Sequence, residues 1–379
     1  MIIYLLTCIR NLFVSLGLDI RRASTTSFKK EIILSNMPDG DPSIAIKISV
    51  FVEKFGLFYE NIAVKKELQI SGAWGDDLAK RRPVQNKIYS HAKAKEIAKF
   101  HENMFFNELV SGILNYGDIY TKPKISKIAI NGLFCDFFDY KNIYPNDSFI
   151  QTKPAVPYWG FLSNGEVITP NDVWYSVQAQ SISDLHYLVS KFESKKSLSF
   201  IEIGSGFGGL AAKLNKAKIF DRLILIDIPH NLVVAYYYLS RSFGESAVEL
   251  ILSAEHLMQC LQNPLSKFIL VPTSLMEIIS SLKGDYIFGN FGSFSEMNYE
   301  TIEFYLNNLP ADTLGVVQIN SNKRVLNSSN HYEVICDDFP FRDDLIKIYS
   351  GKPSGINSSS GGRLKITLHL KDKFFGNKY

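Results

Sequence analysis

The chain has 379 residues, of which 46% are hydrophobic and 21% charged, and its formal net charge is +3. This is the composition of an ordinary globular protein, long enough for one large core or two moderate ones. The small net charge, without a clustered Lys/Arg stripe, argues against a nucleic-acid partner. The four cysteines show no Cys-x-x-Cys or Cys/His spacing, which argues against a disulfide framework or a structural zinc site and predicts a cytoplasmic protein.

Apolar residues recur at helical spacing over residues 1–20. Arg10 and Asn11 interrupt the run, so it is too short to span a bilayer. It also lacks the basic start and the cleavage site of a signal peptide. Two interpretations stay open: a helix lying on the inner face of a membrane, which would make the protein peripheral, or a helix packed on the protein's own body.

Residues 1–150 are predicted to form a mainly helical N-terminal domain. The segment from Ser90 to Gly117 has an N-cap serine, a periodic apolar face and a terminal glycine, and is predicted to be one helix. His91 and His101 are expected on its solvated face. Residues 151–180 are rich in Pro, Asn and Gly, and are predicted to connect the two parts of the chain through one hairpin.

Residues 181–379 alternate between apolar runs and helical segments, which predicts a doubly wound α/β sheet with helices on both faces. After these units, two more runs follow without a clear helix between them and predict a terminal antiparallel pair. The five parallel strands are expected at LSFIEIG, RLILIDIP, KFILVPT, DYIFGNFG and LGVVQIN, and the final pair at YEVICDDF and RLKITLHL.

A glycine-rich turn, EIGSGFGG, follows the first of these strands and opens a helix. Ligands of doubly wound sheets bind outside the carboxyl ends of the strands. Gly204, Gly206 and Gly209 satisfy the pattern G-x-G-x-x-G, and glycines let a cofactor approach the backbone closely. Asp227 ends the next strand, where its carboxylate can accept both hydroxyls of a ribose.

The residue before the turn distinguishes between cofactors. A dinucleotide places its pyrophosphate over the N-terminus of the first helix, where a neighbouring acid is unfavourable. Glu202 lies two residues before Gly204 and suits a ligand that carries an ammonium group and no phosphate, namely S-adenosylmethionine. An NAD-dependent oxidoreductase and a glycine turn without a ligand are the alternatives at this point.

The segments EIGSGFGG and LIDIP resemble motifs I and II of Rossmann-like, class I S-adenosylmethionine-dependent methyltransferases, and the terminal antiparallel pair is similar to theirs. LIDIPHNLVVAYYYLSRSF, FILVP and NFGSFSEMNYETIEFYLNNL further resemble a bacterial family of sugar O-methyltransferases, which carries a D-x-P-x-x-L…YYL element and an N-x-x-S-x-x-E-M element. The resemblance covers residues 200–325. It implies methylation of a sugar hydroxyl in surface polysaccharide or glycoconjugate biosynthesis, with a natural-product methyltransferase or a non-catalytic scaffold as alternatives.

The turn, the strand ends and the resemblance together define the predicted cofactor-binding residues. Beyond the glycines and the two acids, they include residues that follow the second, third and fourth strands. The full set is Glu202, Gly204, Ser205, Gly206, Gly208, Asp227, Ile228, Pro272 and Asn290.

Two residues are candidates for the general base that a poorly nucleophilic sugar hydroxyl needs. His230 follows Asp227 by three residues, and Glu296 lies just past the fourth strand. Each has a structural alternative: His230 as a contact of the following helix, and Glu296 as an acid at the N-terminus of the helix that begins near Asn298.

The predicted substrate-binding residues are Ser293, Tyr158, Trp159 and Tyr236. Sugars stack on aromatic rings, and pockets form at domain junctions, although packing in the core explains such rings as well. The N-terminal domain is expected to cover the site and to select the acceptor. No metal-ligand set is predicted, and the need for a divalent ion and the oligomeric state stay open.

Overall fold

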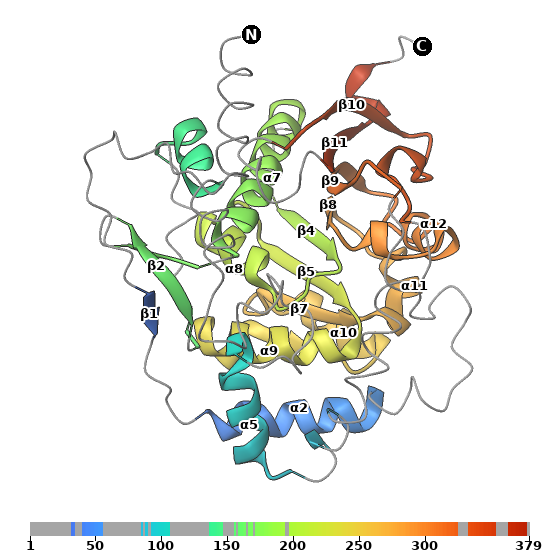
Figure 1. Cartoon of the computed structure of the whole chain (residues 1–379). Coiled ribbons are helices and arrows are strands. Elements are labelled where there is room, and N and C mark those ends of the chain that lie inside the picture. The colour runs from blue at the N-terminus through green and yellow to red at the C-terminus, as the bar shows by residue number, and fades with distance from the viewer. Residues whose placement is uncertain are drawn as a thin grey trace, which may run out of the picture.

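The computed structural model describes residues 32–34, 40–55, 85, 88–89, 92–106, 136–146, 155–156, 158–163, 166–169, 171–193, 197–324, 333–353 and 363–376. An eight-stranded sheet forms the centre, and a three-stranded sheet and the N-terminal helices lie beside it (Figure 1). The predictions for residues 1–20 and for His91 fall outside the described ranges. Within those ranges, no helix has the length and apolar character needed to cross a membrane.

The central sheet confirms the predicted doubly wound architecture. Its strand order is β10-β11-β9-β8-β4-β5-β7-β6, and β11 runs antiparallel to both of its neighbours. All five predicted parallel strands are present, and the short edge strand β6 adds to them. The strands are β4 (Leu198–Ile203), β5 (Arg222–Asp227), β6 (Val248–Leu250), β7 (Phe268–Pro272), β8 (Asp285–Phe291), β9 (Thr313–Ser321), β10 (Leu345–Gly351) and β11 (Leu364–Lys371).

The antiparallel pair at the end of the sheet is confirmed, but one of its predicted strands is wrong. The segment YEVICDDF contains a short 3-10 helix, η8 (Cys336–Asp338), and the partner of β11 is β10 instead. Cys336 and Phe339 are buried at a spacing of three residues, whereas β10 is an edge strand whose residues are mostly exposed or half-buried. Because an exposed edge needs no apolar alternation, the hydrophobic pattern did not reveal it.

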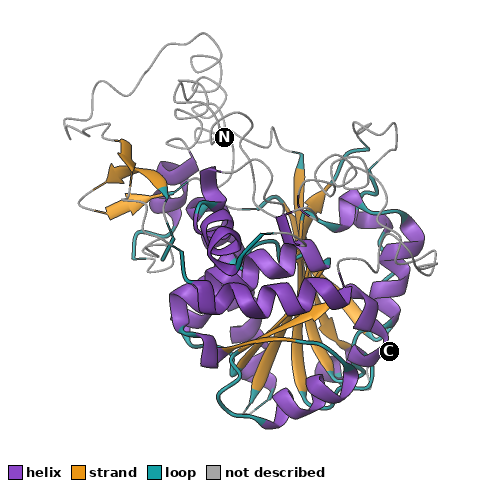
Figure 2. Ribbon diagram, turned by 90° about the horizontal axis from the view of Figure 1, so that it is seen from below, coloured by secondary structure: helices purple, strands orange, loops and turns teal. Residues whose placement is uncertain are grey.

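Helices cover both faces of the sheet, as Figure 2 shows. One face carries α7 (Asp172–Phe192), α8 (Gly209–Ala217) and α9 (Pro229–Phe243). The other carries α10 (Ala254–Gln262), α11 (Met276–Ile279) and α12 (Tyr299–Asn307). Side chains of a strand alternate between faces, so Phe200 joins the core beneath the first group of helices and Ile201 and Ile203 the core beneath the second. Glu202 therefore points to the face of α7, α8 and α9.

The described N-terminal segments combine a small sheet with helices, among them α2 (Pro42–Phe55), α5 (Ala94–Glu102) and a helical segment at residues 136–143. Strand β1 (Ile32–Leu34) pairs with β2 (Trp159–Ser163), and β2 pairs with β3 (Glu166–Ile168) in the predicted hairpin. Helices α2 and α5 both pack on α9, and lie below it in Figure 1.

The single helix predicted from Ser90 to Gly117 is wrong in its extent. Helix α5 begins at Ala94, because the carboxylate of Glu96 accepts a hydrogen bond from the Lys93 backbone N–H at 2.8 Å. It ends at Glu102, and the short 3-10 helix η3 (Met104–Phe106) follows it. Residues 107–117 lie outside the described part.

His101 is also not on a solvated face. It is fully buried, and its ring stacks against Tyr89 and Tyr237 at centroid distances of 5.8 and 5.5 Å. Burial lowers the pKa of His101 to about 3, so its imidazole is neutral at physiological pH. The apolar periodicity of α5 could not show that α9 covers this side of the helix.

A buried polar cluster joins the N-terminal helices to α9. The Tyr237 hydroxyl donates to Glu102 Oε2 at 2.5 Å and accepts from the Asp41 backbone N–H at 2.9 Å. Arg241 Nε donates to the same carboxylate oxygen at 3.2 Å. Glu102 is fully buried, so these partners replace the water that a charged group would otherwise require.

The substitution Tyr237→Phe is expected to lower the free energy of unfolding by about 1–3 kcal/mol, because it leaves a buried carboxylate oxygen and a backbone N–H each short of one partner. Urea denaturation followed by circular dichroism measures this change. Tyr187→Phe, on the exposed side of α7, is the matched control and should stay within about 0.5 kcal/mol of the wild type. Equal effects of the two substitutions would contradict the role given to the cluster.

Candidate active site

The glycine turn holds its shape through backbone conformations that only glycine adopts easily. Gly204, Gly206 and Gly208 have φ angles of +75°, +55° and +81°. The Gly204 backbone N–H donates to the Ile226 carbonyl at 2.8 Å, and the Gly206 N–H donates to Asp227 Oδ2 at 2.8 Å. The turn after β4 is thus tied to the end of β5.

The turn after β8 packs directly onto Gly204. A Cβ atom on Gly204 would lie 2.1 Å from Ser293 Oγ and 2.4 Å from Ser293 Cβ, which no side chain can tolerate. Asn290 donates from Nδ2 to Ser293 Oγ at 2.6 Å and to the Ile203 carbonyl at 2.9 Å. Since Asn290 is fully buried and satisfied within the chain, these contacts favour a positioning role for it over direct ligand contact.

Most of the hydrogen-bond acceptor positions of the Asp227 carboxylate are also occupied by donors from the chain. Its Oδ1 accepts from the Ile228 backbone N–H at 2.7 Å and from Asn231 Nδ2 at 2.9 Å, and its Oδ2 accepts from Gly206. A carboxylate offers about four acceptor positions, so about one is left for a ribose hydroxyl in this arrangement. Burial raises the pKa of Asp227 to about 6, against the opposing effect of these three donors.

Glu202, the second buried carboxylate of the site, differs from Asp227 in its hydrogen bonding. Its side chain is buried, with 3% exposure, and its Oε2 has no hydrogen-bond partner within the described part of the chain. Burial, and then the charge of Asp227, raise the pKa of Glu202 well above its ordinary value. A buried carboxylate with an unpaired oxygen beside a second buried carboxylate fits a cationic group, which would stabilise the ionised form of both.

The remaining predicted cofactor-binding residues lie along the same edge of the sheet. Ile228 is the half-buried N-cap of α9, and Pro272 ends β7 opposite Asp227. Ser205 is buried in the turn, and its Oγ lacks a partner among the residues described. Gly208 serves packing, since a Cβ there would lie 3.0 Å from Leu239 of α9.

The two candidate bases differ in their surroundings. His230 lies in the first turn of α9 and is 3% exposed. Glu296 ends the short 3-10 helix η7 (Phe294–Glu296) and is half-buried. Helix α12 is capped by Asn298, whose side chain accepts from the Thr301 N–H at 2.8 Å, so Glu296 lies outside the first turn of that helix. Of the two candidates, Glu296 is the more accessible side chain.

The structure describes two of the three predicted substrate-binding aromatic side chains, those of Tyr158 and Tyr236. Tyr158 is buried, and burial together with the charge of Asp172 raises its pKa. Trp159 lies in β2, and its side chain falls outside what the structure describes. The Tyr236 hydroxyl donates to Glu245 Oε2 at 3.4 Å, beyond the C-terminal end of α9, so it lies away from the glycine turn.

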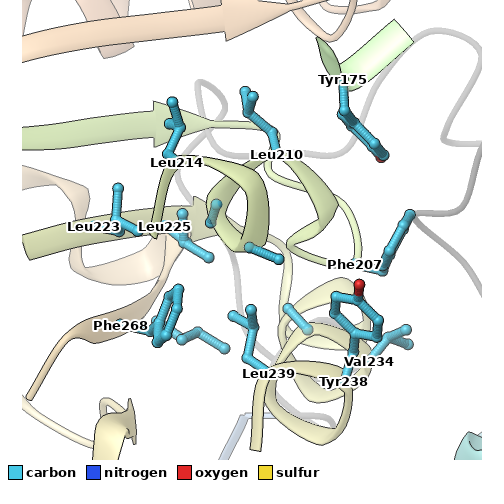
Figure 3. Close-up of a cluster of buried hydrophobic side chains, with 14 of the residues drawn as sticks. Tyr175, Phe207, Leu210, Leu214, Leu223, Leu225, Val234, Tyr238, Leu239 and Phe268 are labelled. Atoms are coloured by element: carbon cyan, nitrogen blue, oxygen red, sulfur yellow. The ribbon is translucent and has the colours of Figure 1, made fainter. Parts of the chain in front are cut away.

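An aromatic cluster around Phe207 was not anticipated from the sequence. Phe207, in the glycine turn itself, lies 5.0 Å from Tyr238, 5.2 Å from Phe105 and 5.6 Å from Tyr175, measured between ring centroids. Figure 3 shows three of these rings converging from α7, α9 and the turn. Phe105 follows α5, so the N-terminal part of the chain contacts the turn directly.

A buried ion pair lies next to this cluster. Lys213 Nζ of α8 is 2.7 Å from Asp172 Oδ1 of α7, and both side chains are at most 5% exposed. The other oxygen of Asp172 accepts from the backbone N–H and the hydroxyl of Thr169, each at 2.7 Å. These bonds hold the start of α7 and the end of β3 against α8.

One cluster of potential metal ligands occurs in the described ranges, away from the glycine turn. Glu249, His256 and Cys260 place their ligand atoms within 4.8 Å of one another, on β6 and α10. His256 Nδ1 accepts from the Leu252 backbone N–H at 3.2 Å, so the neutral ring carries its proton on Nε2, facing Glu249. Burial and the Glu249 charge raise the pKa of Cys260 to about 11, which keeps it a thiol. A metal ion would therefore have to displace the thiol proton of Cys260 in order to bind there.

No protein-family model and no curated protein sequence matches the chain. It is similar to the solved structure of the mitomycin 7-O-methyltransferase MmcR, with 11% identity over 53% of this chain and 57% of that one, and a TM-score of 0.30. For the plantazolicin methyltransferase BpumL in complex with SAH, the identity is 13%, the coverage 52% and 84%, and the TM-score 0.34. For a SAM-dependent methyltransferase from Leishmania major, these values are 11%, 67% and 87%, and 0.36.

The chain thus spans less than two thirds of the length of the mitomycin methyltransferase. At TM-scores this low, the likeness carries no argument about function.

Proposed function

We propose that the protein is an S-adenosylmethionine-dependent O-methyltransferase. The observation that carries this proposal is the buried carboxylate of Glu202, with an oxygen that has no partner among the described residues, beneath a glycine turn that also adjoins Asp227. An ammonium group is favoured beside the carboxylate of Glu202, whereas the pyrophosphate of a dinucleotide would be repelled by it; Asp227, as a ribose acceptor, fits either cofactor. The charge of the site therefore favours S-adenosylmethionine over NAD.

The residues of the turn fit this cofactor. Gly204 and Gly206 give the turn its positive φ angles, Glu202 would bind the α-ammonium group, and Asp227 would accept a ribose hydroxyl. When bound, S-adenosylmethionine supplies an electrophilic methyl group. The protein's own task is to align the acceptor oxygen with that group and to take up its proton. We assign the uptake of the acceptor's hydroxyl proton to half-buried Glu296, three residues after Ser293.

We further propose that the acceptor is a sugar hydroxyl of a surface polysaccharide or another glycoconjugate. The resemblance of NFGSFSEM to sugar O-methyltransferases supports this choice. A sugar hydroxyl is a weak nucleophile, so a carboxylate base such as Glu296 suits it. The cytoplasm is the proposed compartment, with residues 1–20 as a candidate contact with the inner face of the membrane.

Isothermal titration of the full chain with S-adenosylhomocysteine and, separately, with NADH tests the cofactor. The expected result is one site for S-adenosylhomocysteine and no heat from NADH. Binding of NADH, or no binding of S-adenosylhomocysteine, would overturn the proposed function.

Glycan mass spectrometry tests the acceptor. A strain that lacks the gene should produce one sugar lighter by the mass of one methylene group, and the wild-type gene should restore it. A Gly206→Arg gene should not restore it, because the arginine side chain would enter the cofactor site at a residue with positive φ. Unchanged glycans would contradict the sugar assignment and would direct the search to small-molecule acceptors.

A further inference from the structure

A chain of buried polar side chains runs through the sheet next to the proposed cofactor site. Its members come from the carboxyl-terminal halves of β8 and β9, from η7 and its N-cap, and from β11, and all except one are at most 4% exposed. We call it the amide relay. Its members are Asn290, Ser293, Ser295, Gln318, Asn320 and Thr367.

Asn320, near the end of β9, is the branch point of the relay. Its Nδ2 donates to Asn290 Oδ1 at 3.0 Å and to Gln318 Oε1 at 2.7 Å. Its Oδ1 accepts from the backbone N–H and the hydroxyl of Ser295, at 3.3 and 3.4 Å. One fully buried carboxamide thus links β8, β9 and the helix η7 that carries Glu296.

The relay ends at the proposed site. Asn290 Nδ2 donates to Ser293 Oγ at 2.6 Å, and Asn290 Oδ1 accepts from the Phe294 backbone N–H at 3.1 Å. Ser293 is half-buried, the only member that is not buried, and it packs on Gly204. At the opposite end, Gln318 donates to the hydroxyl of buried Thr367 at 2.8 Å.

The donors and acceptors of the relay match one another in a single arrangement. Burying polar groups costs free energy, and a fully satisfied network fixes one geometry where apolar packing would allow several. We infer that Asn320 is a positioning residue, which acts through Asn290 and Ser295 to set Ser293 against the glycine turn and to orient the turn that carries Glu296. This inference rests on the proposed function, since it concerns the same site.

The substitution Asn320→Asp tests the inference with almost no change in shape. It removes both Nδ2 donors and places a carboxylate oxygen against Asn290 Oδ1 and Gln318 Oε1. The dissociation constant for S-adenosylhomocysteine is expected to rise about 10-fold. Thr367→Val is the matched control, because it breaks the relay at its far end, at a residue that is equally buried. It should lower the melting temperature but change the dissociation constant by less than about two-fold.

A double substitution separates positioning from a general loss of structure. If Asn320 acts through Ser293, then Asn320→Asp should weaken binding much less in a Ser293→Ala background than in the wild type. Additive effects in this cycle, or an equal loss of affinity in Thr367→Val, would overturn the inference.

If Asn320→Asp does not fold, Ser295→Ala is the milder variant and should weaken binding in the same direction. Unchanged affinity in Ser295→Ala would then overturn the inference. Failure of the wild-type protein to bind S-adenosylhomocysteine would instead refute the proposed function, so the two failures are distinguishable.

Discussion

The Gly204→Ala protein is expected to lose affinity for S-adenosylhomocysteine by a factor of about 100 or more. Its φ angle of +75° costs an alanine about 1–2 kcal/mol. The new methyl group would also lie 2.1 Å from Ser293 Oγ, so either the glycine turn or the turn after β8 must move. Both turns line the proposed site, and their displacement changes the surface that the ligand contacts. Isothermal titration of the purified variant measures the loss.

Gly244→Ala separates the clash from the backbone strain. Gly244 has a similar φ of +87°, yet nothing described lies within 4 Å of the position that its Cβ would take. With its ψ of 147°, Gly244 lies close to a region that is essentially restricted to glycine, so this control should lose about 1–3 kcal/mol of stability and keep its affinity for S-adenosylhomocysteine. Adding Ser293→Gly to Gly204→Ala should recover part of the lost affinity, because it removes the atoms that clash. Wild-type affinity in Gly204→Ala would show that the two turns do not approach as closely as described.

The sequence predicted those parts of the fold that follow from local pattern and burial. Strands β4, β5, β7, β8 and β9 are buried on both faces and therefore appear as continuous apolar runs. The glycine turn was predictable because its residues with positive φ require glycine. The grouping of the glycine turn with Asp227 followed from the rule that parallel strands present their carboxyl ends at one edge.

The contacts between distant segments could not be predicted in this way. The exposure of His101 was mispredicted because its contact with Tyr237 of α9 is set by how the helices dock, and the contact of Tyr236 with Glu245 likewise follows only from the folded chain. The position of Phe207 within the aromatic cluster depends on Phe105, about a hundred residues earlier in the chain. Asn320 carries no local signal at all, since its role arises only from the pairing of β8 with β9.

The ligand-free protein and the ligand complex are expected to respond to pH in opposite directions. Burial raises the pKa of Asp227 to about 6 and that of Glu202 well above its ordinary value. The native state therefore holds protons that the unfolded chain has already released, and the free energy of unfolding falls as the pH rises from about 4 towards neutrality. A cationic ligand binds the ionised carboxylates, so its affinity should rise over the same range, and binding should release protons. Titration near pH 6, in buffers of different ionisation enthalpy, measures that release.

The substitution Glu202→Gln should therefore act with opposite signs on stability and on binding. The amide keeps the shape but removes the buried charge, so the ligand-free protein should be at least as stable as the wild type at neutral pH, while the affinity for S-adenosylhomocysteine falls about 100-fold. The proton release on binding should fall with it. Glu102→Gln is the matched control: Glu102 is equally buried, but Tyr237 and Arg241 already pair with it.

Glu102→Gln should accordingly lose stability and retain its affinity for the ligand, the reverse of the pattern at Glu202. A buried carboxylate with a structural role, such as Glu102, has hydrogen-bond partners within the chain. A buried carboxylate that binds a ligand, as proposed for Glu202, is expected to have an oxygen without a partner among the described residues when no ligand is bound. If Glu202→Gln lowers stability as Glu102→Gln does and leaves binding unchanged, then the carboxylate of Glu202 serves the fold, and the argument from its charge to a sulfonium cofactor fails.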